Sequence, residues 1–485
     1  MDGNHGAARG GSAAGNSAAG GPIADDSTNA AADGSTRDLT KGRPIAQILV
    51  FSLPLVAGTL FQQVYSFADS VVVGRLISDA ALGAVGVTYS LNFLTLGFIQ
   101  GACVGFSIPA AQAFGARDHA GFRRYAWNGA WLCAAMSVAF TAAFCLLARP
   151  LLELISTPPD LMDMAWRYIM VIFLSIPSAV LYNHSAALLR AVGDSRHPFY
   201  FLVASCAINV CFDVFFITVC RMGVVGSALG NIVGQTISSG LNCWWAFTRV
   251  PIFREMLSPA HRADMRPSGA HLRRLAAVGV PMGFEVSVSA IGAIIMQNAI
   301  NLLGSAAVTA QTAGEKIRQL FTLPMESVGM AMATYAGQNL GARRLDRIKR
   351  GLASGTVIQA VYCMACFVVI RLFSRPLVGS VLGDADPRIV DDAALYLTII
   401  SGYFLIHGTL MIFRNTLQGM GYSTHAVISG VGELAGRALG AWLAGAGLGY
   451  LAICYANQFA WAFALAYCMV MTAVMIRRKR HEFAR

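Results

Sequence analysis

Four polar side chains interrupt apolar stretches in the first half of this sequence, and together they could bind a cation. Asp69 lies in QQVYSFADSVVVG, and Asn231 lies in GSALGNIVGQ. Asn209 and Asp213 lie in AINVCFDVFFI, four residues apart and therefore on one face of a helix. None of these stretches contains Lys or Arg. Because a carboxylate inside a membrane is costly without a cation, we expect all four residues to form a cation-coupling site.

The ligand type limits which ion such a site would bind. Carboxylate and amide oxygens are hard ligands, which makes Asp69, Asn209 and Asp213 a candidate Na⁺ site. A proton would serve as well, because a carboxyl group in apolar surroundings holds its proton more tightly. The alternative is structural, with Asp69 and Asp213 capping or pinning helices through hydrogen bonds.

The second half of the sequence carries charges of both signs. Glu433 and Arg437 are four residues apart and can neutralise each other without an ion. Glu285 follows the break GVPMG, in which Pro281 bends the helix. It is either a carboxylate for a substrate or a salt-bridge partner of Lys316 or Arg437. We expect a polar network made of Glu433, Arg437, Lys316 and Glu315.

Four residues are candidates for contacting a substrate: Glu285, Tyr65, Gln62 and Met296. Aromatic and Met side chains can line a cavity for an amphipathic drug. At helical spacing, such residues also pack in a core or face lipid, so both interpretations stay open.

The composition is that of a membrane protein. Of 485 residues, 56% are hydrophobic and only 13% are charged, against about 25% charged in soluble domains. Twelve stretches have the length of a membrane span, which predicts an all-α protein with twelve transmembrane helices. The net charge of +11 comes from loops and tail, without a basic stripe interleaved with aromatics. We therefore expect no nucleic-acid partner.

The chain divides into five regions by composition. The predicted regions are a disordered N-terminal tail (1–43), a first lobe of six spans (44–250), a cytoplasmic linker (251–271), a second lobe of six spans (272–476) and a basic C-terminal tail (477–485). The first region contains almost no large apolar side chains and cannot offset chain entropy by burial.

Two motifs occur once in each half. Residues 112–117 read QAFGAR and residues 338–343 read QNLGAR. Likewise, LRAVGDSRHP at 189–198 matches LQGMGYSTHA at 417–426. Two matches at nearly constant separation indicate a duplicated unit, and duplication of membrane units is typical of transporters.

The placement of Lys and Arg predicts the orientation. They concentrate in the loops after spans 2, 4, 6 and 8 and in the C-terminal tail, as at 343–350 (RRLDRIKR) and 477–480 (RRKR). Positive charge marks the cytoplasmic side, so both termini are expected there. With six crossings per half, both halves start on the same side. The repeat is therefore parallel, with a pseudo-two-fold axis along the membrane normal.

These motifs resemble the MATE (multidrug and toxic compound extrusion) transporters over residues 44–476. The resemblance rests on SLP followed by Asp69 in the first span, on both QxxGAR motifs, on both LxxxG motifs and on N-x-x-x-D in the fifth span. It implies two six-helix lobes in a V and secondary antiport of organic cations against H⁺ or Na⁺. It also places a first-lobe cation site on Asp69, Asn209 and Asp213, with Asn231 where the family has Thr.

Other classes of function fit less well. No Walker A motif is present, so ATP does not drive transport directly. No catalytic motif is present, and we expect neither an enzyme nor a cofactor beyond the coupling ion. We expect a monomer in the plasma (inner) membrane, in contact with lipid. The alternative is a flippase for a lipid-linked saccharide of the related superfamily, for which Lys316, Arg414 and Arg437 would bind phosphate.

Overall fold

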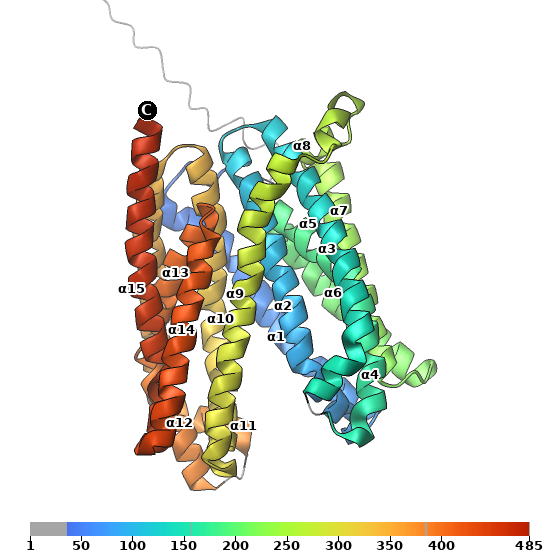
Figure 1. The fold of residues 1–485 in the computed structure, drawn as a ribbon, viewed down its shortest axis with the longest axis vertical. Helices are drawn as coiled ribbons and strands as arrows, with labels where there is room; N and C mark the ends of the chain where they lie inside the picture. Colours follow the sequence, from blue (N-terminus) through green and yellow to red (C-terminus); the bar gives the residue numbers. More distant parts are fainter. Residues whose placement is uncertain (1–35, 156, 384–385, 485) are drawn as a thin grey trace, which may run out of the picture. The chain divides into compact units, whose positions relative to one another are not determined.

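The computed structural model describes residues 36–155, 157–383 and 386–484, and these residues form helices without any strand. In chain order (Figure 1) the elements are α1 (Pro44–Leu76), α2 (Asp79–Gly115), α3 (His119–Leu154), α4 (Pro159–Leu174), α5 (Ile176–Ala191), α6 (Arg196–Val214), η1 (Phe215–Val219), α7 (Val224–Arg249), α8 (Pro251–Met256), η2 (Pro259–Met265), α9 (Gly269–Leu302), α10 (Ser305–Gly341), α11 (Leu345–Leu382), α12 (Pro387–Ser401), α13 (Phe404–Gly419), α14 (Ser423–Leu443), η3 (Ala444–Leu448) and α15 (Gly449–Ala484).

Most of these helices are long and apolar enough to cross a membrane. By length and composition alone, seven segments of the described chain could cross a membrane, or nine if each of two bent pairs is counted as one span. One passing segment, Ser423–Ala484, contains both α14 and α15. The helices α7 and α10 also have membrane length but carry more polar residues. Within the described residues these make the twelve expected spans, six in an N-lobe (α1–α7) and six in a C-lobe (α9–α15).

Two of the predicted single spans are bent pairs of helices. Helices α4 and α5 together form one expected span and meet at 43° around Ser175, with Pro177 in the first turn of α5. Helices α12 and α13 form another and meet at 50°. The linker predicted at 251–271 folds into α8 and η2 before α9 begins.

The backbone repeats as the sequence does. Arg117 and Arg343, the last residues of the QxxGAR motifs, both have φ 57°, an unusual value for residues with a side chain. Within its described residues each lobe also contains one π-helix, η1 or η3, followed by a glycine with positive φ at Gly223 or Gly449. These matched irregular features confirm that the lobes are copies of one unit.

Small residues bring helices of the two lobes into close contact. Gly101 and Gly105 of α2 face α9, where a Cβ on Gly105 would lie 2.4 Å from the Cα of Gly279. A Cβ on Gly101 would lie 2.5 Å from the carbonyl oxygen of Met282. Figure 1 shows α9 running beside α2. Packing of this kind, with glycines four residues apart, is typical of membrane helices.

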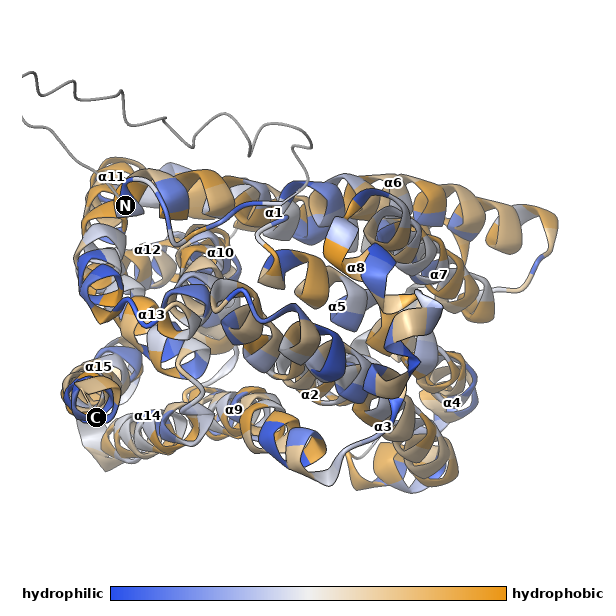
Figure 2. Ribbon diagram, turned by 90° about the horizontal axis from the view of Figure 1, so that it is seen from above, coloured by the Kyte–Doolittle hydropathy of each residue, from blue (hydrophilic) through white to orange (hydrophobic). Residues whose placement is uncertain are grey.

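Large apolar side chains point outward from the bundle. Leu146 of α3 is 81% exposed and Val361 of α11 is 69% exposed. Figure 2 shows hydrophobic residues along the outer faces of α6 and α11. Such an apolar exterior suits lipid rather than water as solvent. We call the end of the bundle where α2 and α10 terminate the basic end, because Arg117, Arg124 and Arg343 lie there.

Candidate functional site

Two carboxyl groups meet inside the N-lobe. Asp69 of α1 and Asp213 of α6 are hydrogen-bonded to each other, and Ser227 of α7 donates to Asp69 Oδ1 at 3.3 Å. Asp213 is fully buried. Among the described residues neither carboxyl group forms an ion pair with a basic side chain. Two carboxyl groups this close either share a proton or, if both are ionised, require another cation between them.

An amide and a phenol complete this cluster. With the Asn209 amide nitrogen facing the carboxyl group, it donates to Asp213 Oδ2 at 2.6 Å, and its oxygen accepts from the backbone N–H of Asn231 at 3.1 Å. The hydroxyl of Tyr65 lies 2.8 Å from the same amide. The structure therefore brings Asp69, Asn209, Asp213 and Tyr65 together from α1 and α6. We call these residues, together with Ser227, the carboxyl cluster.

Glycines on α7 make room for the cluster. A Cβ on Gly230 would lie 2.0 Å from Asp213 Oδ1, and one on Gly234 would lie 3.0 Å from the Cβ of Asn209. Across the same contact, Ser205 of α6 donates to the carbonyl of Gly234 at 2.6 Å. Because a side chain at Gly230 would displace the carboxyl group, this glycine is part of the geometry of the site.

Three further candidate residues lie elsewhere. The side chain of Asn231 accepts from Gln235 at 2.9 Å, so Asn231 reaches the cluster only through its backbone. Gln62 is exposed on α1, on the same face as Tyr65 and Asp69. Met296 is 6% exposed and packs with Ile300 and other apolar residues between α9 and α15.

The C-lobe holds a charge network centred on Arg414 of α13. This buried guanidinium lies 3.3 Å from Glu285 Oε1, forms an ion pair with Glu433, and donates to Ser429 Oγ at 3.1 Å. Glu433 also pairs with Arg437 at 3.6 Å, as its spacing predicts. Glu285 therefore pairs with Arg414 rather than with Lys316 or Arg437, the partners considered from the sequence.

Glu315 belongs to a separate group. Its carboxylate accepts from Arg318 Nε at 2.7 Å and from the hydroxyl of Tyr396 at 2.5 Å. Gln311 donates to the same carboxylate at 3.2 Å. The neighbouring Lys316 is exposed. The expected C-lobe network is thus two groups, with Arg414 at the centre of one and Glu315 at the centre of the other.

The repeated QxxGAR motifs contact the opposite lobes at the basic end. Gln112 of α2 donates through Nε2 to the carbonyl of Gly419 in the C-lobe at 3.0 Å. Gln338 of α10 donates to the carbonyl of Ala191 in the N-lobe at 2.8 Å. A Cβ on Gly115 would lie 2.0 Å from the carbonyl oxygen of Gln338, and one on Gly341 would lie 1.8 Å from that of Gln112. We call the reciprocal contacts of Gln112, Gly115, Gln338 and Gly341 the glutamine clamp.

Residues 37–42, which precede α1, pack against the glutamine clamp. The backbone N–H of Leu39 donates to Gln338 Oε1 at 2.9 Å, and that of Arg37 donates to the carbonyl of Val192 at 3.1 Å. Arg347 of α11 donates to the carbonyls of Leu39, Lys41 and Gly42 at 2.9–3.2 Å. We call residues 37–42 the N-terminal strap. Of the tail predicted at 1–43, residues 1–35 lie outside the described residues, whereas the strap is bound to both lobes.

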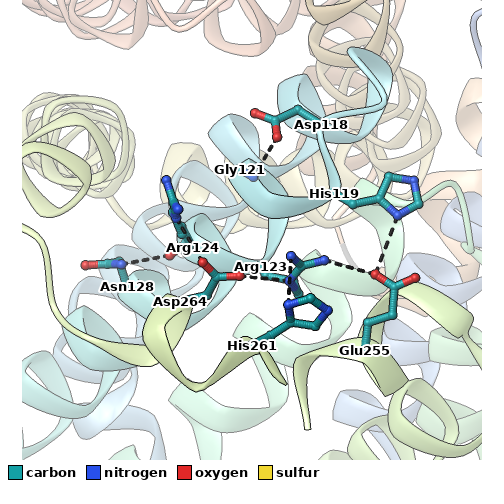
Figure 3. Close-up of polar contacts among 9 residues, drawn as sticks. All are labelled: Asp118, His119, Gly121, Arg123, Arg124, Asn128, Glu255, His261 and Asp264. Carbon is teal, nitrogen blue, oxygen red and sulfur yellow. Dashed lines mark hydrogen bonds and ion pairs between the residues drawn. The ribbon is translucent and has the colours of Figure 1, made fainter. Parts of the chain in front are cut away.

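The linker is attached to the N-lobe through ion pairs. Asp264 lies between Arg123 and Arg124, with Nε–Oδ distances of 2.9 Å to each (Figure 3). Glu255 lies between Arg123, at 3.0 Å, and His119, at 3.6 Å. Asn128 accepts from the backbone N–H of Ser268 at 2.8 Å, just before α9 begins. The linker therefore fixes the start of α9 to α3.

A comparison with protein families identifies the chain. The MatE family model matches it twice, over residues 54–215 and 281–442, one match in each lobe. The chain belongs to the MATE family. All residues of its carboxyl cluster except Ser227 lie in the first match, and the Arg414 network lies in the second.

Individual MATE relatives are distant in sequence. The probable multidrug resistance protein YpnP of Bacillus subtilis is 27% identical over 384 residues, which cover 79% of this chain and 84% of that protein. YoeA of the same organism, also named a probable multidrug resistance protein, is 24% identical and covers 77% and 80%. A MATE crystal structure in the bent conformation has a TM-score of 0.84 at 20% identity and covers 92% of this chain and 98% of that one. This structural likeness confirms the fold.

The sequence-based prediction did not name Ser227, and it considered Arg414 only as a phosphate ligand of the flippase alternative. Ser227 lies one helical turn before Asn231, and a hydroxyl in the small-residue run GSALGN was the signal for it. Arg414 follows the apolar run MIF, and only its ion pairs with Glu285 and Glu433 show its place in the network.

Replacing the central cation of this MATE network should destabilise the protein. Arg414→Met would leave Glu285 without a cation and Glu433 with only Arg437 at 3.6 Å, and removing one side of a buried ion pair costs about 3–5 kcal/mol. We expect a lower thermal unfolding midpoint in detergent. The matched control is the neutral triple variant Arg414→Met, Glu285→Gln, Glu433→Gln, which should recover most of the loss. An Arg414→Met protein as stable as wild type would contradict this account.

The linker should loosen in acid. Burial raises the pKa of Asp264, but hydrogen bonds and charge from Arg123 and Arg124 outweigh burial and hold that pKa below its ordinary value of 3.8. The contribution of the carboxylate to stability is thus complete above pH 3.8 and is lost as pH falls through the lower folded-state pKa.

The matching variant is Asp264→Asn. It should speed hydrogen exchange of the amides of residues 259–268 roughly 10- to 100-fold at pH 7, since hydrogen bonds to charged groups contribute about 1.5–3 kcal/mol. The difference between variant and wild type should shrink below pH 3.8. Equal exchange at pH 7 would show that the ion pairs do not hold the linker.

Proposed function

We propose that this MATE transporter exports small organic cations in exchange for H⁺ or Na⁺ by alternating access. The observation that carries the proposal is the carboxyl cluster, in which Asp69 and Asp213 share one site without a basic partner among the described residues. Such a pair stabilises one bound cation and disfavours an empty, fully ionised state. The relatives named for multidrug resistance support drugs as the substrate class.

The proposed orientation places the basic end in the cytoplasm, with both termini. The positive-inside rule supports it, since Arg124, Arg343 and Arg350 lie at this end. The glutamine clamp then closes the cytoplasmic side, and transport requires Gln112 and Gln338 to release the opposite lobe.

Helix α1 connects the ion site to this closure. It carries Asp69 in its last two turns and follows directly on the N-terminal strap. Midway, its Thr59 hydroxyl lies 2.9 Å from the hydroxyl of Ser327 on α10. An ion that enters between Asp69 and Asp213 replaces their mutual hydrogen bond, so it changes the contacts that hold α1. We propose that this change in α1 alters its packing on the C-lobe and expels substrate.

The substrate would approach along one face of α1. Gln62, Tyr65 and Asp69 share that face, with Gln62 exposed and Tyr65 in contact with the carboxyl cluster. A cationic substrate placed there would compete with the coupling ion for the same negative charge, which is what an exchanger requires. Glu285 is engaged by Arg414 and Gln418, so it would contact a substrate only after leaving those partners.

The geometry of the C-lobe supports the flippase alternative less than it supports antiport. Its phosphate site would need free cations, and Arg414 and Arg437 are both bound to Glu433. The exposed Lys316 is then the remaining cation of the three considered.

The test is uptake of a cationic dye into inverted vesicles that contain the full-length protein. H⁺ and Na⁺ gradients are imposed separately, and uptake that responds to one of them is the expected result. A fluorescent anionic phospholipid is followed in parallel for movement between leaflets. Lipid movement without gradient-driven dye uptake would favour the flippase and overturn the antiport proposal.

A further inference from the structure

A pocket lies between three C-lobe helices at the basic end, away from the carboxyl cluster and the Arg414 network. Its volume is about 280 Å³, and residues of α11, α13 and α15 line it: Lys349, Leu352, Phe413, Met469, Thr472, Ala473, Ile476 and Arg477. Six of these eight residues present apolar groups, because the Thr472 hydroxyl is already bonded to the carbonyl of Cys468 at 2.7 Å. The interior of the pocket therefore suits a hydrocarbon chain.

The two remaining lining residues give the pocket a positive rim. Lys349 and Arg477 are exposed, and neither forms an ion pair within the described part of the chain. None of the lining residues is acidic. An apolar pocket with two cations at its mouth is complementary to an amphiphilic anion. It would repel the organic cations proposed as substrate.

The depth of the pocket matches that of lipid headgroups. Lys349 lies in the second turn of α11, which begins at the basic end, and Arg477 begins the run RRKR at the exit of α15. Basic pockets between membrane helices on the cytoplasmic side are suited to anionic lipid headgroups, and clusters of Lys and Arg next to a span attract the same lipids.

We propose that this pocket binds an anionic phospholipid of the cytoplasmic leaflet, with the phosphate between Lys349 and Arg477. One acyl chain lies on Leu352, Phe413 and Ile476. The choice of leaflet rests on the proposed orientation, whereas the binding itself does not depend on transport.

The bound lipid would reinforce the closed basic end. Lys349 is two residues from Arg347, which holds the N-terminal strap, and Phe413 is adjacent to Arg414 on α13. A lipid that joins α11 to α15 therefore limits the motion of the helix turns that carry Arg347 and Arg414.

The experiment measures lipid binding to purified full-length protein in a non-ionic detergent. Phosphatidylglycerol and phosphatidylcholine with the same acyl chains are titrated separately, and bound lipids are counted by native mass spectrometry. We expect phosphatidylglycerol to bind more tightly. Lys349→Ala with Arg477→Ala should weaken it roughly 10- to 30-fold, since each basic contact contributes about 1 kcal/mol. Ala473→Trp, which fills the apolar part, should also weaken binding while leaving both cations in place.

The matched control is Arg478→Ala with Arg480→Ala, two exposed residues of the same run that do not line the pocket. This variant should keep the preference for phosphatidylglycerol. Equal weakening in the control would show diffuse attraction to the tail and overturn the site. Equal binding of phosphatidylcholine, or full competition by inorganic phosphate at the same concentration as the lipid, would also overturn it.

Discussion

Transport driven by an ion gradient should fall about 30-fold or more in Asp213→Asn, whereas the amount of folded protein in the membrane should stay close to wild type. Asn cannot take up a proton and binds Na⁺ with one charge fewer. Removing one partner from a buried hydrogen-bonded charge pair typically costs about 2–5 kcal/mol, and 1.36 kcal/mol corresponds to a factor of ten. The variant keeps the volume of Asp213, which is needed because Gly230 packs against its carboxyl group.

The measurement is gradient-driven dye uptake in vesicles, with protein content checked by size-exclusion chromatography in detergent. Asp163→Asn is the matched control, because Asp163 is exposed on α4. Asp69→Asn should show the same loss as Asp213→Asn, since both belong to one hydrogen-bonded pair. Normal uptake by a well-expressed Asp213→Asn protein would remove the carboxyl cluster from the coupling mechanism.

Gly341→Ala should prevent closure of the basic end. The added methyl group would lie 1.8 Å from the carbonyl oxygen of Gln112, far inside any real contact, and the nearest atoms belong to backbone that cannot rotate away. Helices α2 and α10 would have to separate by more than 1 Å at this point. We expect at least a tenfold loss of transport, because a conformation that the cycle requires becomes costly by more than about 1.4 kcal/mol.

Hydrogen exchange distinguishes this effect from general unfolding. The amide of Leu39 is bonded to Gln338, so peptides that contain the N-terminal strap should exchange faster in Gly341→Ala while those from the lobe interiors stay protected. Gly240→Ala on α7 is the control, since a Cβ there meets nothing within 4 Å. If Gly341→Ala transported normally, the glutamine clamp would have no role in the cycle.

The fold could be predicted from the sequence because its main signals are periodic. Apolar span length and the repeated QxxGAR and LxxxG motifs predict two equivalent six-helix lobes. The positive φ values of Arg117 and Arg343 show that even the irregular turns were copied. Pro177 marks the position of the bend at Ser175, but the bend at Gly402 could not be predicted, because its apolar sequence is the same for a straight and a bent helix.

The site was only partly predictable, for a physical reason. Asn209 and Asp213 share a helix face, so spacing alone brings them together, and Asp69 is conspicuous as an acid in an apolar span. Asn231 was chosen on its side chain, yet in the structure its backbone N–H faces Asn209 and its side chain binds Gln235. Which turn of α7 faces the cluster depends on packing at Gly230 and Gly234, and no local pattern encodes that.

The contacts that hold the lobes together could not be predicted from the sequence for a different reason. Gln112 and Gln338 were visible only as a repeat, because their partners are backbone carbonyls of the opposite lobe. The N-terminal strap was assigned to a disordered tail on composition. It is bound through its backbone carbonyls to Arg347, and backbone acceptors leave no trace in composition.

The two glutamines differ in the group that donates to their side-chain oxygens. The Oε1 of Gln338 accepts from the backbone N–H of Leu39 in the N-terminal strap, whereas the Oε1 of Gln112 accepts from the Arg274 guanidinium at 2.8 Å, just after a linker fixed to α3. A substitution can remove a guanidinium but cannot remove a backbone amide. The two halves of the glutamine clamp can therefore be weakened separately, although their glutamines are copies of each other.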